Sequence, residues 1–506
     1  MPVVTSTIGH ACPCSQGEHL KNHTKRFVVP AILAALTVGS FGISSASAKS
    51  ASPKAAAKSC PAAPDAALDA KYGKGAGALE QALACGEAKP LKATGKPVIV
   101  GIMNPEGDPA GSFPEYTVMA QAAVDYINKE LGGVGADYKA GKPGRPLKLE
   151  VCKMAINPAD SQKCANELAA KKPLVVYSTL NFFGNHFSIL NNAKVPVVVG
   201  TPISPADFTT KGVYAIGGGG GCLGVHTGLI EFATAEVLKY KANSKVGVPW
   251  ANTPPGVFCY HDLEKKPLNV LNGSNGKNTS KVAGKMPGMT HIGVPIKPGS
   301  ADVTADAQKV LEFKPDVMVY SAQGADCWTF VNSLLKLGWT PATPLVLSGA
   351  CIDLTTMRAL GDKIKGVYTV GAASILDPDA LKDPQQQREA RLYNSKGKKY
   401  AKDKTSLEKG FGTQGFTGVM AIWQMANQLG TKLTGPALTK FIEATNGFHT
   451  FASTGLACKK AVAPYVAVCN STVSASRWTG KALKEVKANF SGLGLIAGTA
   501  LDFGKG

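Results

Sequence analysis

The alternation of short Val/Ile runs with amphipathic segments constrains the fold of this chain more than any other feature. In the first half, the apolar runs are PVIVGIMNP, LKLEVCKM, PLVVYST, VPVVVGT and GVYAIG. Strands of continuous apolar residues are typical of parallel sheets that are buried on both faces. Between them, EYTVMAQAAVDYINKEL carries its apolar residues on one helical face. Strands that alternate with helices form βαβ units, so the sequence predicts an α/β fold.

The same alternation begins again in the second half of the 506 residues. The helical segments there are VTADAQKVLEF and CWTFVNSLLKLG, and the strand-like runs are KVGVPWA, THIGVPI, PDVMVYSA, TPLVLSGA and GVYTVGAA. A chain of this length is enough for about two to four domains. Two series of βαβ units therefore predict two doubly wound parallel-sheet lobes in one chain.

The N-terminal segment has the organisation of a secretory signal. Lys21, Lys25 and Arg26 precede the apolar run FVVPAILAALTVGSFGI, and Ala46 and Ala48 supply an A-x-A cleavage signal. A membrane anchor is the alternative, but the run of roughly 17 residues is short for a span and contains Pro and Gly. We expect residues 1–48 to be a signal peptide with an N-terminal extension. The mature chain is then exported to the periplasm, the extracellular space or the cell envelope.

Residues 49–96 are rich in Ala, Lys and Pro, which predicts a flexible linker with one short helix near 78–85. The formal net charge of the chain is +20, and such a charge favours anionic partners. The lysines are scattered and no nucleic-acid motif accompanies them, so we expect a solvated surface and no nucleic-acid partner. Adhesion to the cell envelope through this charge is an alternative function.

Cysteine usage agrees with export. The chain has 12 Cys. Cys12 and Cys14 precede the predicted cleavage site, which leaves an even number, and disulfides are the expected state in an oxidising compartment. Sequence alone does not fix the connectivity. The simplest proposal pairs neighbours along the chain: Cys60–Cys85, Cys152–Cys164, Cys222–Cys259, Cys327–Cys351 and Cys458–Cys469. No CxxC motif occurs and no His lies at zinc spacing from a Cys, so we expect neither a metal nor a cofactor.

Polar and aromatic residues follow the predicted strands, where ligands bind in open α/β sheets. Hydroxyls and backbone N–H groups at helix starts suit a carboxylate or another small polar group, although each such residue alone could be a helix cap. The loops have few of the titratable groups that acid–base chemistry needs, and GxSxG and GxxxxGK[ST] motifs are absent, so we expect no enzymatic activity. The predicted ligand contacts are Ser112, Phe113, Tyr116, Thr179, Asn181, Phe182, Thr201, Ser204, Ser321, Gln323 and Gln414.

Five consecutive glycines, Gly217 to Gly221, follow the strand-like run VYAI. They match GxGxxG, but a dinucleotide fingerprint follows the first strand of a unit and this run follows the fifth. A passage between the lobes is the favoured interpretation, because glycine gives a hinge its conformational freedom and lets the backbone approach a ligand closely.

The order of these motifs resembles the type I periplasmic solute-binding proteins, in the branch similar to the Leu/Ile/Val-binding receptors of ABC transporters. The resemblance runs from VIVGIMNPEGDPAGSFPEY through PLVVYSTLNFFGNH and VPVVVGTPISPADF to IKGVYTVGA, and covers roughly residues 97–450. It implies three crossings between the lobes, with Gly217, Gly218 and Gly371 as hinge residues and the third crossing near Phe448–Gly455. The expected bounds are 97–216 and 373–449 for lobe 1, and 217–372 and 450–490 for lobe 2.

The resemblance also implies a function. An exported substrate-binding protein of this kind captures a small polar solute (an amino acid, an amide or a small carboxylate) between its lobes and delivers it to the membrane permease of an ABC importer, its only contact with the membrane. The acidic side chain with which amino-acid-binding members hold the ligand ammonium has no clear counterpart in SAQGADCW or SGACID. An uncharged or anionic, partly aromatic ligand is therefore an equal alternative. A ligand-sensing module of a signalling system and an exported enzyme are the alternative functions.

Overall fold

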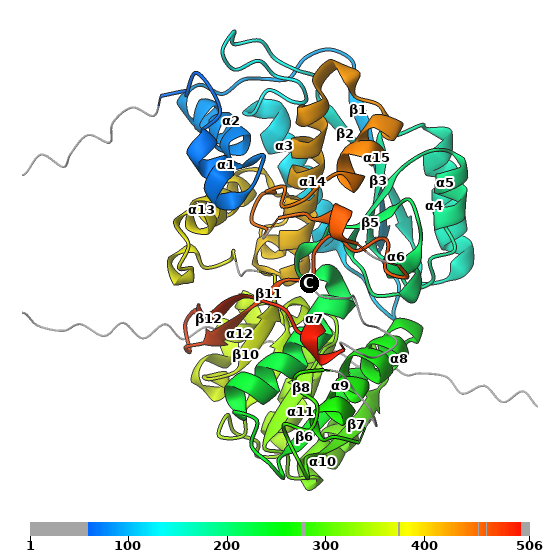
Figure 1. The fold of residues 1–506 in the computed structure, drawn as a ribbon, viewed down its shortest axis with the longest axis vertical. Helices are drawn as coiled ribbons and strands as arrows, with labels where there is room; N and C mark the ends of the chain where they lie inside the picture. The colour runs from blue at the N-terminus through cyan, green and yellow to red at the C-terminus, as the bar shows by residue number, and fades with distance from the viewer. Residues whose placement is uncertain (1–58, 275–279, 373–374, 454, 462, 497–506) are drawn as a thin grey trace, which may run out of the picture. The chain divides into compact units, whose positions relative to one another are not determined.

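The computed structural model describes residues 59–274, 280–372, 375–453, 455–461 and 463–496 (Figure 1). All of them belong to one compact unit, residues 57–506. The predicted signal peptide, 1–48, lies outside the described residues. Within the described part of the chain, no helix has the length and apolar character that a membrane span requires.

The first sheet contains five parallel strands in the order β2-β1-β3-β4-β5, which is one of the two common orders of doubly wound sheets. In its centre, Val100 lies between Leu149 of β2 and Val175 of β3. The strands are β1 (Val98–Pro105), β2 (Leu147–Met154), β3 (Val175–Leu180), β4 (Val197–Thr201) and β5 (Val213–Ala215).

Several helices beside the first sheet begin with side-chain caps. In α4, the Asn157 side chain accepts a hydrogen bond from the Asp160 amide at 2.8 Å and Pro158 occupies the first turn, two features that favour a helix start. The helices are α3 (Pro114–Lys129), α4 (Pro158–Ala170), α5 (Phe187–Asn192), α6 (Pro205–Thr209), α13 (Pro384–Tyr400), α14 (Gly410–Leu429) and α15 (Gly435–Glu443). Helix α14 packs closely on α3. The lack of a side chain at Gly415 allows this approach, because a Cβ there would lie only 2.3 Å from the Tyr116 carbonyl oxygen.

The second sheet repeats the first and then extends it. Strands β7-β6-β8-β9-β10 are parallel and reproduce the same order, and β11 and β12 add an antiparallel pair at the edge. The two-lobe α/β prediction is confirmed, whereas the antiparallel pair was not predicted. The strands are β6 (Lys245–Ala251), β7 (Thr290–Ile296), β8 (Val317–Tyr320), β9 (Leu345–Ser348), β10 (Tyr368–Gly371), β11 (Val473–Trp478) and β12 (Leu483–Phe490).

Two π-helical turns interrupt the helices of the second lobe. Segment η2 (Phe232–Val237) continues α7, and η3 (His261–Lys265) joins α8 to α9. Pro267 follows η3 and has no N–H to donate, which removes one bond of a regular α-helix. The α-helices are α7 (Gly221–Glu231), α8 (Pro254–Tyr260), α9 (Lys266–Leu271), α10 (Thr304–Glu312), α11 (Ala325–Lys336) and α12 (Leu354–Leu360).

The expected flexible linker at 49–96 is wrong for its described part, whereas the short helix expected near 78–85 is present within α2. Two helices form there, α1 (Ala66–Tyr72) and α2 (Ala76–Ala88), and Leu79 and Leu83 of α2 are buried in the core beside α3. Arg388 of α13 holds α2 from outside through ion pairs to Glu80 at 2.6 Å and Glu87 at 3.2 Å. The alanines that suggested a linker are the small residues that this packing needs.

The third crossing between the sheets lies later in the chain than expected. Val468 forms a parallel bridge with Ala215 of β5, and the Cys469 amide donates to the Ala215 carbonyl at 3.3 Å. The chain enters the second sheet only at Val473. The described residues between 450 and 469 therefore accompany the first sheet, and the crossing expected near Phe448–Gly455 is replaced by one at 470–472.

The cysteines of the described chain are joined as Cys60–Cys85, Cys152–Cys164, Cys222–Cys259, Cys327–Cys351 and Cys458–Cys469. These are the pairs expected from chain neighbours. Each bridge connects elements that pack together, as Cys222 of α7 and Cys259 of α8 do beside the second sheet.

Candidate ligand-binding site

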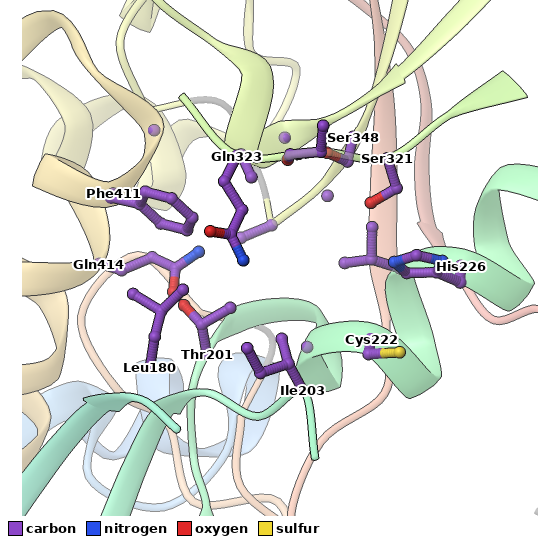
Figure 2. A pocket seen from close by; sticks show the side chains of 18 of the residues that line it. Leu180, Thr201, Ile203, Cys222, His226, Ser321, Gln323, Ser348, Phe411 and Gln414 are labelled. Carbon is purple, nitrogen blue, oxygen red and sulfur yellow. Dashed lines mark hydrogen bonds between the residues drawn. The ribbon is translucent and has the colours of Figure 1, made fainter. Parts of the chain in front are cut away.

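A cavity lies where the carboxyl ends of strands from both sheets meet the first turns of α7 and α14 (Figure 2). It holds about 100 Å³, several times the room that one buried water needs. Its polar side chains are Thr201, His226, Thr253, Ser321, Gln323, Ser348, Thr413 and Gln414, and its larger apolar ones are Leu180, Ile203, Val225, Ile352, Ile375, Leu376 and Phe411. Among the described residues of the wall there is no Asp, Glu, Lys or Arg.

Four predicted ligand contacts line this cavity: Thr201, Ser321, Gln323 and Gln414. Thr201 and Gln414 come from the first lobe, from the end of β4 and the first turn of α14, and the other two follow β8 in the second. Figure 2 shows the Gln323 side chain extending into the space opposite Gln414. The cavity thus receives amides and hydroxyls from both sheets.

Tyr116 does not line the cavity but supports two residues that do. Its buried hydroxyl contacts the Thr201 hydroxyl and donates to Oε1 of Gln414 at 2.6 Å, and the Thr201 hydroxyl donates to the same oxygen. Burial raises the pKa of the Tyr116 hydroxyl well above its ordinary value, so the group keeps its proton and remains a donor. Because Oε1 of Gln414 receives both hydroxyls, the amide nitrogen is the end that faces the cavity (Figure 2).

The other predicted contacts in the first lobe hold loops instead of lining the cavity. Asn181 donates to Asp207 at 2.8 Å and to the Ser204 hydroxyl at 3.2 Å, and burial raises the pKa of Asp207 to about 6. Thr179 donates to the Met103 carbonyl at 3.0 Å. These side chains fix the strand ends of β1, β3 and β4 relative to one another, which is a structural role.

Three further predicted residues lie away from the cavity. Ser112 is exposed and accepts a hydrogen bond from the Gly107 amide at 2.9 Å. Phe113 and Phe182 are buried in the hydrophobic core, and Phe113 packs edge-on against Phe411, with ring centroids 5.1 Å apart. Phe113 therefore supports an aromatic residue of the wall from behind.

Several residues of the wall were not predicted. Ile203 and Thr413 lie next to the predicted contacts Ser204 and Gln414. Thr253 follows β6 and Ser348 ends β9, two strands after which no contact was predicted. No sequence feature had indicated His226 as a ligand contact. It lies on α7, one helical turn beyond the glycine run, and only the fold shows that this turn faces the cavity.

The glycine run shapes the wall by letting backbone approach backbone. Gly221 begins α7 and has a φ of +54°, and a Cβ there would lie 2.0 Å from the Pro202 carbonyl oxygen. Gly410 begins α14 and also lines the cavity. The N–H groups of a helix's first turn favour an anionic or acceptor group. Two such turns meet here, although the Cys222 and Gly410 amides already donate to the Pro202 and Ile352 carbonyls.

Comparison with known proteins agrees with this geometry. Residues 270–463 match the family model described as periplasmic binding protein. A leucine-binding protein from Thermotoga maritima superposes with a TM-score of 0.56 at 14% identity, over 78% of this chain and 98% of that one. The chain therefore has the fold of the type I periplasmic binding proteins. No curated protein sequence matches it.

Two further structures share the type I periplasmic binding protein fold. A fatty acid ABC transporter substrate-binding protein from Thermomonospora curvata has a TM-score of 0.59 at 15% identity, covering 82% of this chain and 96% of that one. A branched-chain amino acid ABC transporter protein from Thermus thermophilus, with bound valine, has a TM-score of 0.58 at 12% identity, covering 80% and 98%. At these identities the likeness establishes the fold and leaves the ligand to the chemistry of the cavity.

Proposed function

We propose that this protein is an exported solute-binding protein that holds a small molecule in the cavity between its two sheets and delivers it to the permease of an ABC importer. The observation that carries the proposal is the wall itself, in which amides and hydroxyls from both sheets surround an otherwise apolar space. A few placed polar groups in an apolar cleft are typical of small-molecule sites. The transport names of the similar structures support delivery to an importer, and no observation favours the sensing module.

The wall favours an uncharged or singly anionic ligand over a free amino acid. A desolvated ammonium group needs a carboxylate or several carbonyl acceptors, and the described wall offers no carboxylate. Amide nitrogens, hydroxyls and helix first turns are donors, so they suit a carbonyl or carboxylate oxygen. Of the ligand classes that the sequence left open, an amide or a small carboxylate fits better than an amino acid.

A matched set of ligands tests the proposal by thermal shift: 4-methylpentanoate, 4-methylpentanamide and L-leucine share one isobutyl body. A ligand present at 100 times its Kd should add about 2.7 kcal/mol to the free energy of unfolding. We expect the carboxylate and the amide to raise Tm more than leucine does. A larger rise with leucine than with both of the others would contradict the preference for a ligand without an ammonium group.

The variant Gln323→Ala tests whether the ligand binds in this cavity. Removing the amide that extends into the cavity should weaken binding about tenfold, which is about 1.4 kcal/mol. Gln308→Ala is the matched control, because Gln308 is exposed on α10 and donates only to Glu312 within its own helix. Equal ligand affinities of the two variants, measured by calorimetry, would place the binding site elsewhere.

A further inference from the structure

One titratable pair stands at the wall of the cavity, among hydroxyls and amides. His226 of α7 lines the cavity, and its Nδ1 is 2.8 Å from Oε1 of Glu264. The Glu264 side chain is only 1% exposed. Within the described chain, neither its oxygens nor His226 Nδ1 form a hydrogen bond of regular geometry, so the 2.8 Å contact is their one close polar approach. A buried carboxylate with a single polar neighbour is costly unless that neighbour shares a proton with it.

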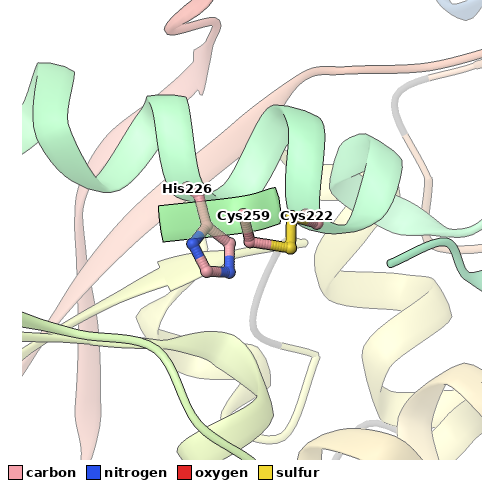
Figure 3. A group of neighbouring side chains, drawn as sticks. All are labelled: Cys222, His226 and Cys259. Atoms are coloured by element: carbon pink, nitrogen blue, oxygen red, sulfur yellow. A yellow bond between two sulfur atoms is a disulfide. The ribbon is translucent and has the colours of Figure 1, made fainter. Parts of the chain in front are cut away.

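A disulfide bond about one helical turn away also connects the two helical segments that carry His226 and Glu264. Cys222 precedes His226 by one turn of α7, and Cys259 precedes Glu264 by one wider turn through the π-helical segment η3. The disulfide between Cys222 and Cys259 fixes the two helices at that level (Figure 3). The two sulfurs and one ring nitrogen of His226 lie within 4.8 Å of one another, and both sulfurs are engaged in the bridge. Imidazole, bridge and carboxylate therefore form one packed group.

Three arrangements of protons are possible for His226 and Glu264. If the pair is ionic, the imidazolium carries hydrogens on both nitrogens. If the carboxyl group keeps its proton and donates it to Nδ1, the hydrogen of the neutral imidazole is on Nε2. If a neutral ring donates an Nδ1 hydrogen to the carboxylate, Nε2 is an acceptor and the negative charge stays buried. An acidic ligand group beside Nε2 favours the ionic arrangement, which gives His226 a hydrogen on Nε2 and compensates the charge of Glu264.

We infer that His226 is the anchor for an acidic group of the ligand and that Glu264 is its positioning residue, so that the cavity takes monocarboxylates with an apolar body. This inference rests on the proposed function and narrows it. His226 is the only side chain of the described wall that can carry a positive charge. A bound carboxylate stabilises the imidazolium, and the charge-assisted hydrogen bond is stronger than the one to a neutral amide. Ile203, Val225 and Leu180 supply apolar surface for the rest of the molecule.

Calorimetry with 4-methylpentanoate and 4-methylpentanamide tests the inference on the purified protein and on His226→Gln. We expect the wild type to bind the carboxylate more tightly than the amide. In His226→Gln the carboxylate should lose about 10- to 100-fold in affinity, the range for one hydrogen bond to a charged group, whereas the amide should change less than threefold. His291→Gln is the control, because His291 lies on β7, contacts Asn269 and is not part of the wall.

The positioning role of Glu264 has its own readout. Nitrogen-15 spectra of the histidine side chains, with His226 assigned by its loss in His226→Gln, should show hydrogens on both ring nitrogens when 4-methylpentanoate is bound to the wild type. Glu264→Gln removes the charge that compensates an imidazolium, although its amide can still hydrogen-bond to Nδ1, so we expect the imidazolium signal to weaken and the carboxylate affinity to fall. Glu312→Gln, at an exposed site on α10, should change neither.

The outcomes separate this inference from the proposed function. Equal losses for carboxylate and amide in His226→Gln, or an unchanged His226 spectrum in Glu264→Gln, would show a merely structural role and overturn the inference. A wild-type protein that binds the amide or leucine but not the carboxylate would overturn the inference and leave a solute-binding protein. A folded protein that binds none of the three would count against both.

Discussion

Replacing Gly217 with alanine should destabilise the protein by about 3 kcal/mol or more, at or beyond the upper end of the usual cost of overpacking. Gly217 follows β5 at the first passage between the sheets, and a Cβ built on it would lie 1.5 Å from the carbonyl oxygen of Gly200. Its φ is −60°, which suits any residue. At such a φ, replacing glycine with alanine ordinarily stabilises a protein by about 0.4–1 kcal/mol, because it reduces the conformational entropy of the unfolded chain. The contact with Gly200 makes the replacement destabilising instead.

Urea unfolding of Gly217→Ala and Gly494→Ala measures this effect. No atom lies within 4 Å of a Cβ at Gly494, and its φ is outside the left-handed region, so this variant should change stability by less than about 1 kcal/mol. A Gly217→Ala protein as stable as the control would show that β4 and β5 separate easily at this point. It would also remove the steric explanation for the start of the glycine run.

His449→Leu should cost about 3–5 kcal/mol, the usual effect of removing one partner of a buried ion pair. Glu389 of α13 is fully buried, and His449 Nε2 lies 2.8 Å from its Oε1. The Gln385 amide at 2.8 Å and the Ala452 backbone amide also donate to this carboxylate. Without His449 the charge of Glu389 is left to these neutral donors. The double variant Glu389→Leu with His449→Leu should recover part of the loss, because no charge is then buried.

The same pair makes stability depend on pH. Burial acts to lower the pKa of His449, but the Glu389 carboxylate outweighs it and the pKa is raised above its ordinary value near 6.5. A group with a raised folded pKa contributes its stability fully below its unfolded pKa and loses it as the pH rises through the folded pKa. Unfolding free energies measured from pH 6 upward should therefore fall in the wild type and stay flatter in His449→Leu. Parallel curves would mean that His449 is not charged in the folded protein.

His186 is another buried histidine, but its contribution to stability changes in a different pH range from that of His449. Burial lowers the pKa of His186 to about 4, so this histidine is neutral near pH 7 and its contribution changes only on the acid side. The decline above pH 6 can thus be assigned to His449 and not to His186.

The Val/Ile runs predicted β1 to β10 because a strand buried on both faces needs apolar residues throughout. The strands β11 and β12 were not predicted, since VSASRW and LKEVKANF contain small and charged residues and no Val/Ile run. The edge strand β12 has exposed residues along its length, whereas β11 is buried except at Arg477. Helix α1 was not predicted, and α2 was predicted only as a short helix near 78–85, because their alanine-rich sequence also suits a linker. Contacts with α13 and the Cys60–Cys85 bridge decide between these two states.

The site was predicted at the level of loops and not of side chains. Strand ends pointed to the segments that hold Thr201, Gln323 and Gln414, because the carboxyl ends of parallel strands share one edge. Whether a hydroxyl in such a loop faces the cavity, as Thr201 does, or braces the loop, as Thr179 does, depends on side-chain direction at each strand end. His226 needed still more, since its partner Glu264 comes into reach only through the packing of α7 on a π-helical turn.

All five cysteine bridges are local, with sequence separations between 11 and 37 residues. Each ties together parts of the same half of the molecule, and none of them connects the first sheet with the second. Disulfide formation therefore stiffens each half and adds no covalent bond between the two sheets. The two halves can therefore be cross-linked internally and still move apart, because widening the space between the two sheets breaks no disulfide bond.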